Sequence, residues 1–245
     1  MGISFSWAHR RRKKPGEHPF CTAVIVAAGT ASRMGGIDKI MANLGDRPVI
    51  IHSILAFQSC PLVQEIVVVT REDLMTDLNQ LVRQWNCTKV SRIVRGGASR
   101  TESVSIGISR ADERARLIAI HDGARPLVSQ QVLHDVISAA GDCSAAAPAI
   151  PVKDTIKEAD GQGLIVRTVP RDALRAVQTP QVFDRDLIKA ALFQAQERGE
   201  ALTDDCAAVE AMGMKVTLTQ GSERNIKITT PIDLAVGEAL LCQPD

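Results

Sequence analysis

Residues 20–150 alternate between strand-like and helix-like segments, and this alternation predicts an α/β protein with a Rossmann-like, mostly parallel sheet flanked by helices. Hydrophobic residues make up 45% of the 245-residue chain, which is enough for a substantial core. A polar stretch near residues 151–183 interrupts the alternation and predicts an inserted β-hairpin arm.

Each element of this fold has its own signal. Short apolar runs predict strands at residues 23–28, 65–70, 90–95, 117–121 and 144–150. Helical periodicity predicts helices at residues 48–58, 74–85, 101–110 and 130–140. Pro48 suits the start of the first helix, and Ser129 can cap the fourth.

The arm is predicted from residues 153–159 and 164–168, which flank the turn Gly161-Gln162-Gly163. A polar hairpin of this size has too little core to be stable alone, so we expect it to pack against a second subunit in a homodimer. Beyond it, helices are expected at 184–198, 204–212 and 232–241, with a strand at 215–219 and another that contains Lys227.

Composition limits the domain organisation and the partners. Residues 10–14 are all Arg or Lys, and residues 1–19 are expected to form a disordered tail, with a transit peptide or a weak anionic tether as alternatives. Residues 20–245 are expected to form a single domain. The net charge of +1 and the 3% aromatic content disfavour nucleic acid, and no apolar run approaches the roughly 18 residues of a membrane span. Six scattered cysteines without zinc-site spacing indicate a reducing compartment, so we expect a cytoplasmic protein, or a plastid one if the tail is a transit remnant.

The loop after the first strand is the strongest functional signal. An apolar strand ends in the turn Ala27-Ala28-Gly29, and Arg33 and Lys39 follow within one loop. Unpaired backbone N–H groups and two cations suit a triphosphate. The spacing matches neither a P-loop nor the GxGxxG fingerprint, and an ordinary turn with two solvated cations is the alternative.

Three further loops have a high density of polar residues: GGASRTES at 96–103, HDGARP at 121–126 and NIKITTPIDL near the C-terminus. In α/β folds, ligands bind beyond the carboxyl ends of the strands, so the loops after Ala28, Arg95 and His121 should meet at one edge. Taken singly, each loop is also explained by turn chemistry.

In their order, these motifs, together with PVKDT, TPQVF and LTDDCAAVE, resemble the 2-C-methyl-D-erythritol 4-phosphate cytidylyltransferase family over residues 22–241. The resemblance implies a fold of the nucleotidyltransferase type. It also implies a reaction of CTP with a small polyol phosphate that releases pyrophosphate, with Mg²⁺ or another divalent cation held mainly by the CTP phosphates and not by protein ligands. Phosphoryl transfer of this kind depends on positioning and cations more than on a nucleophilic side chain.

The resemblance also assigns roles to residues. The catalytic residues would be Arg33, Lys39, Arg171 and Lys227. The nucleotide would contact Ala27, Ala28, Gly29, Gly97, Ser103 and Asp122. The acceptor would contact Asp122, Arg125, Thr155, Arg171, Thr179, Thr203 and Lys227, of which Thr155 and Arg171 would reach into the neighbouring subunit.

The sequence departs from the family pattern at three positions: Asp38 where proline often precedes the lysine, Ala98 where an acidic residue is common, and Gly123 where alanine is frequent. Three alternative functions stay open. They are ribitol 5-phosphate cytidylyltransferase or another sugar-phosphate nucleotidyltransferase, a non-catalytic nucleotide-binding module, and a metal-dependent hydrolase that uses Asp204 and Asp205. The last is disfavoured because helix capping explains an acidic pair at that position.

Overall fold

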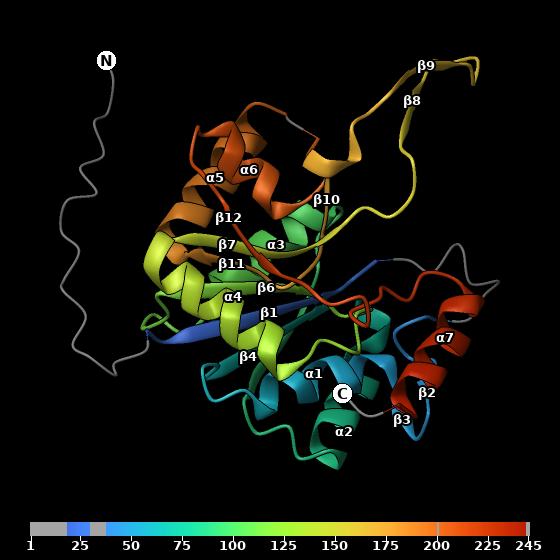
Figure 1. Ribbon diagram of the computed structural model, residues 1–245. Helices are drawn as coiled ribbons and strands as arrows, with labels where there is room; N and C mark the ends of the chain where they lie inside the picture. The colour runs from blue at the N-terminus through green and yellow to red at the C-terminus, as the bar shows by residue number, and fades with distance from the viewer. Residues whose placement is uncertain (1–18, 30–37, 200, 244–245) are drawn as a thin grey trace, which may run out of the picture.

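The computed structural model describes residues 19–29, 38–199 and 201–243, so residues 1–18 of the predicted tail and Arg33 lie outside the described residues. A central sheet runs through the molecule with helices on both sides (Figure 1). Its strands are β1 (Cys21–Ala27), β4 (Glu65–Thr70), β5 (Val90–Arg95), β6 (Leu117–Asp122), β7 (Ala145–Pro151), β10 (Arg175–Val177), β11 (Gln181–Asp184) and β12 (Thr217–Gln220).

The strand order is β10-β7-β11-β6-β1-β4-β5, with β12 paired to β7. The pairs β1–β4, β1–β6, β4–β5 and β7–β12 are parallel, and β10 and β11 are antiparallel to their neighbours. The predicted α/β class and mostly parallel sheet are confirmed. The two antiparallel strands β10 and β11 were not predicted.

Alternate residues of the strands pack against two layers of helices. Ile25 of β1 belongs to a cluster formed with α1 (Val49–Ser59), α2 (Met75–Gln84) and α4 (Gln130–Cys143). Its neighbour Val24 belongs to a second cluster, formed with α3 (Arg100–Ser109), α5 (Arg185–Glu197) and α6 (Asp205–Ala211). This period of two is what a strand buried on both faces requires.

Helix ends follow the predicted signals. The Ser129 side chain accepts a hydrogen bond from the Val132 N–H at 3.3 Å, and α1 begins directly after Pro48. Asp204 caps α6 by accepting from the Ala207 N–H at 2.9 Å. The predicted helices are therefore present with ends close to those expected.

The arm contains β8 (Lys157–Ala159) and β9 (Ile165–Thr168), which pair antiparallel and lie away from the rest of the molecule (Figure 1). Leu164, Ile165 and Val166 are at least 60% exposed. A run of apolar side chains on an otherwise unsupported hairpin is typical of a surface that another chain covers.

One predicted strand is wrong. Residues 221–230, which include Lys227, contain no strand, and Ile228 makes one backbone bond, to the Ala124 carbonyl at 2.8 Å. This segment leads into α7 (Pro231–Leu241), which packs beside the short pair β2 (Asn43–Leu44) and β3 (Arg47–Pro48) (Figure 1). Two 3₁₀ turns, η1 (Glu72–Leu74) and η2 (Arg171–Ala173), complete the described elements. No helix in the described ranges is long and apolar enough to cross a membrane.

Candidate active site

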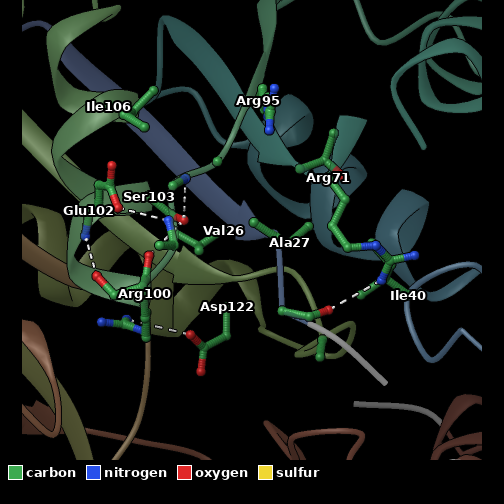
Figure 2. A pocket seen from close by; sticks show the side chains of 18 of the residues that line it. Val26, Ala27, Ile40, Arg71, Arg95, Arg100, Glu102, Ser103, Ile106 and Asp122 are labelled. Carbon is green, nitrogen blue, oxygen red and sulfur yellow. Dashed lines mark hydrogen bonds and ion pairs between the residues drawn. The ribbon is translucent and has the colours of Figure 1, made fainter. Parts of the chain in front are cut away.

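A cavity of about 900 Å³ opens where β1, β4, β5 and β6 end at their carboxyl sides (Figure 2). The loops after Ala28, Arg95 and His121 meet here, as the sequence predicted. Parallel strands bring these loops together because all of their carboxyl ends lie at one edge of the sheet.

Backbone forms one wall of the cavity, at the loop after β5. The Gly97 N–H donates to the Ser103 hydroxyl at 3.1 Å, which donates to the Ser99 carbonyl at 2.9 Å. The Ala98 N–H donates to Glu102 Oε2 at 2.7 Å. A Cβ placed on Gly96 would lie 2.5 Å from the Ala28 Cβ, so this wall requires glycine for its close approach to the end of β1.

Another part of the cavity wall is charged. Asp122 is 9% exposed and accepts from Lys227 Nζ at 2.7 Å, with Arg100 Nη2 at 3.5 Å and Arg125 Nε at 3.8 Å. Figure 2 shows Arg100 and Asp122 pointing toward one another. Burial by itself would raise the pKa of Asp122, but Lys227 and then Arg100 lower it to about 2. Asp122 is therefore ionised at neutral pH.

A buried chain of hydrogen bonds holds the backbone at Asp122 in place. The Asp122 N–H donates to Thr179 Oγ1 at 3.1 Å, and Thr179 Oγ1 lies 3.1 Å from His121 Nδ1. His121 Nε2 lies 3.1 Å from the Arg125 carbonyl, which can only accept, so the proton is on Nε2 and Nδ1 accepts from the Thr179 hydroxyl. Burial lowers the pKa of His121 to about 4, so the imidazole is uncharged at neutral pH.

Sequence reasoning missed Arg100 as a site residue. It lines the cavity from the start of α3 and pairs with Asp205 of α6, through Nη1–Oδ1 at 3.0 Å and Nη2–Oδ2 at 2.8 Å. The motif GGASRTES contains Arg100, but its partner lies 105 residues further along the chain. Asp205 was interpreted as part of a capping pair. Asp204 does cap α6, whereas Asp205 is buried against Arg100.

The structure brings many of the predicted site residues together, and others lie elsewhere. The cavity is lined by Ala27, Ala28, Gly29, Lys39, Gly97, Ser103, Asp122 and Lys227. Arg125 and Thr179 lie behind Asp122, as the contacts above place them. Three predicted residues do not line this cavity: Thr155, Arg171 and Thr203. Arg171 donates to the Lys153 carbonyl within the arm at 2.8 Å. Arg71 and Arg95 line the cavity and were not predicted.

Three carboxylates, those of Glu72, Glu102 and Asp122, line the described part of the cavity. Within the described ranges, no group of three His, Cys, Asp or Glu side chains converges as a metal site. On the charged side of the cavity the carboxylate is that of Asp122, and three cations already surround it. Mg²⁺ commonly keeps its waters and binds one or two carboxylates together with substrate phosphates.

Comparison with known proteins decides the family. The family model of 2-C-methyl-D-erythritol 4-phosphate cytidylyltransferase matches residues 21–243. The chain belongs to this family. A cytidylyltransferase of that name from Caldanaerobacter subterraneus subsp. tengcongensis is 45% identical over 224 residues, which cover 90% of this chain and 98% of the relative. One from Dehalococcoides mccartyi strain 195 is 42% identical, over 89% and 95% of the two chains.

Solved structures of the cytidylyltransferase family share the fold. The 4-diphosphocytidyl-2C-methyl-D-erythritol synthase of Anaerococcus prevotii superposes with a TM-score of 0.82 at 30% identity, over 92% of this chain and 97% of that one. The family enzyme of Thermus thermophilus superposes with a TM-score of 0.74 at 32% identity, over 89% and 97%. The resemblance that the sequence motifs indicated is confirmed.

Proposed function

We propose that the protein transfers CMP from CTP to 2-C-methyl-D-erythritol 4-phosphate, giving 4-diphosphocytidyl-2-C-methyl-D-erythritol and pyrophosphate. The observation that supports this most strongly is the cavity itself: in a chain of this family, a glycine-rich loop, Lys39 and the Asp122–Lys227 pair line one cavity of about 900 Å³. An oxygen of the acceptor phosphate attacks the α-phosphorus, and the bond to pyrophosphate breaks in line.

The residues divide between the two substrates. Ala27, Ala28 and Gly29 follow β1 and offer backbone groups to the triphosphate, while the loop of Gly97 and Ser103 accommodates the cytosine. Lys39 and, from its place in the motif, Arg33 stabilise charge on the transferring phosphoryl group. Mg²⁺ on the CTP phosphates neutralises part of the same charge.

Lys227 and Asp122 orient the attacking side of the reaction. The Lys227 ammonium lies 2.7 Å from the Asp122 carboxylate, so it is already directed into the cavity before a phosphate binds. Asp122 also lies where a ribose or polyol hydroxyl can donate to it. Arg125, Thr179 and Thr203 are proposed acceptor-side residues, and the first two act on the cavity through Asp122.

A homodimer completes the proposed site. The arm exposes Leu164, Ile165 and Val166, and Thr155 and Arg171 lie in the same inserted segment. Exposed apolar residues on the hairpin support association with a second copy, which would bring Thr155 and Arg171 to the neighbour's cavity. The bacterial origin of the relatives supports a cytoplasmic location.

A pyrophosphate-release assay with CTP, Mg²⁺ and a panel of polyol phosphates tests the function. We expect 2-C-methyl-D-erythritol 4-phosphate to exceed D-ribitol 5-phosphate in kcat/KM by at least about tenfold, since a pocket fitted to one branched methyl discriminates by about 1–3 kcal/mol. Equal or reversed preference would assign the protein to ribitol phosphate. No pyrophosphate with any acceptor would support a non-catalytic nucleotide-binding module.

A further inference from the structure

Arg71 lies directly after β4 and makes contacts on both edges of its guanidinium. On one side, Nε and Nη2 donate to the two carboxylate oxygens of Asp73 at 3.1 and 3.0 Å. On the other, Nη2 donates to Asp38 Oδ2 at 2.6 Å and Nη1 to the Gly29 carbonyl at 3.4 Å. Figure 2 shows the Arg71 side chain extending along the cavity wall toward Ile40.

The strand register explains why Arg71 reaches these groups. Ala27 of β1 pairs with Thr70 of β4, so Arg71 begins where both strands end and lies beside the turn that contains Gly29. Two nitrogens of the planar guanidinium donate to the two carboxylate oxygens of Asp73, and this bidentate contact fixes the orientation of the Arg71 side chain. The contact with Asp73 therefore orients Arg71 for its contact with Asp38.

Asp38 connects this arginine to the backbone around Lys39. Its Oδ1 accepts from the Ile40 N–H at 3.0 Å, and its carbonyl accepts from Met41 and Ala42 at 3.1 and 2.8 Å. Lys39 lies between the two residues that this side-chain bond joins, and it lines the cavity. The carboxylate of Asp38 thus holds Arg71 with one oxygen and the turn of Lys39 with the other.

We infer that Arg71 is a positioning residue for Lys39: through Asp38 it fixes the turn that presents the Lys39 ammonium to the transferring phosphoryl group. The inference rests on the proposed function, which gives Lys39 its role. All three guanidinium nitrogens of Arg71 contact protein oxygens, so its geometry fits a brace better than a direct phosphate ligand. Both side chains are mostly buried, at 23% and 20% exposure, so water screens the pair less than a surface ion pair.

A double-mutant cycle on pyrophosphate release separates the two roles. If Arg71 acts through Asp38, Arg71→Ala and Asp38→Ala should each lower kcat about five- to tenfold, with KM for CTP changed by less than about twofold. The double variant should be no more than about twofold slower than the slower single variant, because both changes remove one connection. Arg114→Ala, which removes an exposed arginine paired with Asp112, is the matched control and should leave kcat unchanged.

A direct phosphate ligand would give a different pattern. Arg71→Ala would then raise KM for CTP, Asp38→Ala would leave both constants near wild type, and the effects of the two changes would multiply. That pattern overturns the inference and leaves the proposed function standing. A wild-type protein that releases no pyrophosphate from CTP overturns the proposed function instead.

Hydrogen exchange tests the brace without relying on activity. In Arg71→Ala, the amides of Ile40, Met41 and Ala42 should exchange at least about fivefold faster than in the wild type, because their acceptor residue has lost its anchor. Amides of β6 in the same sample should be unchanged. Equal exchange at residues 40–42 in variant and wild type would mean that Arg71 does not fix this turn, and the inference fails.

Discussion

Arg100 and Asp205 form a bidentate ion pair between α3 and α6, with N–O distances of 3.0 and 2.8 Å. The Asp205 side chain is 2% exposed, and burial raises its pKa, an effect that Arg100 opposes. Since Arg100 also lies 3.5 Å from Asp122, the pair connects the core beneath α6 to the charged side of the cavity.

Arg100→Ala should therefore lower stability more than the loss of an ordinary surface arginine. Removing one partner leaves Asp205 buried without a counter-charge, which costs about 3 kcal/mol, the lower end of the usual range because Arg100 is 34% exposed. Urea denaturation measures the loss. Arg114→Ala serves as the control, since the pair with Asp112 is at the surface and should change the midpoint little. Equal losses of stability from the two substitutions would show that the buried Arg100–Asp205 pair stabilises the protein no more than the exposed Arg114–Asp112 pair.

His121 should make the protein less stable in mild acid. Its pKa is about 4 in the folded chain and 6.5 when unfolded, so between these values the unfolded state binds more protons. Stability is then complete above pH 6.5 and is lost as the pH falls to 4, by about 3 kcal/mol. Denaturation curves between pH 4 and 7.5 measure the slope.

His121→Asn should flatten that slope, whatever its effect on stability at pH 7.5. His52 is half-buried and its pKa is also lowered, mainly by burial, so His52→Asn is the necessary comparison. If the slope persists in His121→Asn and disappears in His52→Asn, the acid sensitivity comes from His52 and the prediction for His121 is wrong.

Gly96→Ala should damage the nucleotide side of the cavity. The added Cβ would meet the Ala28 Cβ at 2.5 Å and the Ser103 hydroxyl at 2.8 Å, so the glycine wall must shift. We expect kcat/KM for CTP to fall at least about tenfold, because small displacements of binding groups are costly in phosphoryl transfer. At Gly161, on the tip of the arm, the added Cβ would meet nothing within 4 Å, and Gly161→Ala should behave as wild type. Unchanged kinetics in Gly96→Ala would mean that CTP does not use this wall.

Mixing two inactive variants tests the shared site. Arg171→Ala and Lys227→Ala chains should each be inactive alone. If subunits exchange, mixed dimers contain one cavity with both residues intact, and equal mixing should restore roughly a quarter of wild-type activity. Proven exchange without recovery would place Arg171 and Lys227 in the cavity of the same chain.

Local signals predicted most of the fold, and long-range contacts account for what they missed. The Ser129 cap and the strand that ends at Asp122 depend on nearby residues, and both are present. β11 was missed because it is only four residues long and antiparallel to both neighbours, which periodicity does not reveal. Lys227 was placed in a strand, yet the neighbouring Ile228 N–H donates to the loop at Ala124, a contact with a distant loop that local sequence does not reveal.

The same division holds for the site. Glycine turns at strand ends predicted the cavity wall, because such turns are local features. Arg100 was missed because its role depends on Asp205, which lies on another helix. Thr179 was predicted as an acceptor contact, which stays a prediction, but the bonds of its hydroxyl to the Asp122 N–H and to His121 were not foreseen. These contacts depend on the fold and leave no trace in local spacing.

The arm is an insertion between β7 and β10, two neighbouring strands of the central sheet. The chain leaves at Pro151 and returns at Arg175, and these two residues are paired in the β7–β10 ladder, which closes the base of the arm. Shortly after Arg175 the backbone reaches Thr179, whose hydroxyl accepts the Asp122 N–H. The five residues Arg175–Thr179 and a single hydrogen bond therefore join the base of the arm to the Asp122 backbone, so the segment that anchors the arm in the sheet is also the one that holds Asp122 in place.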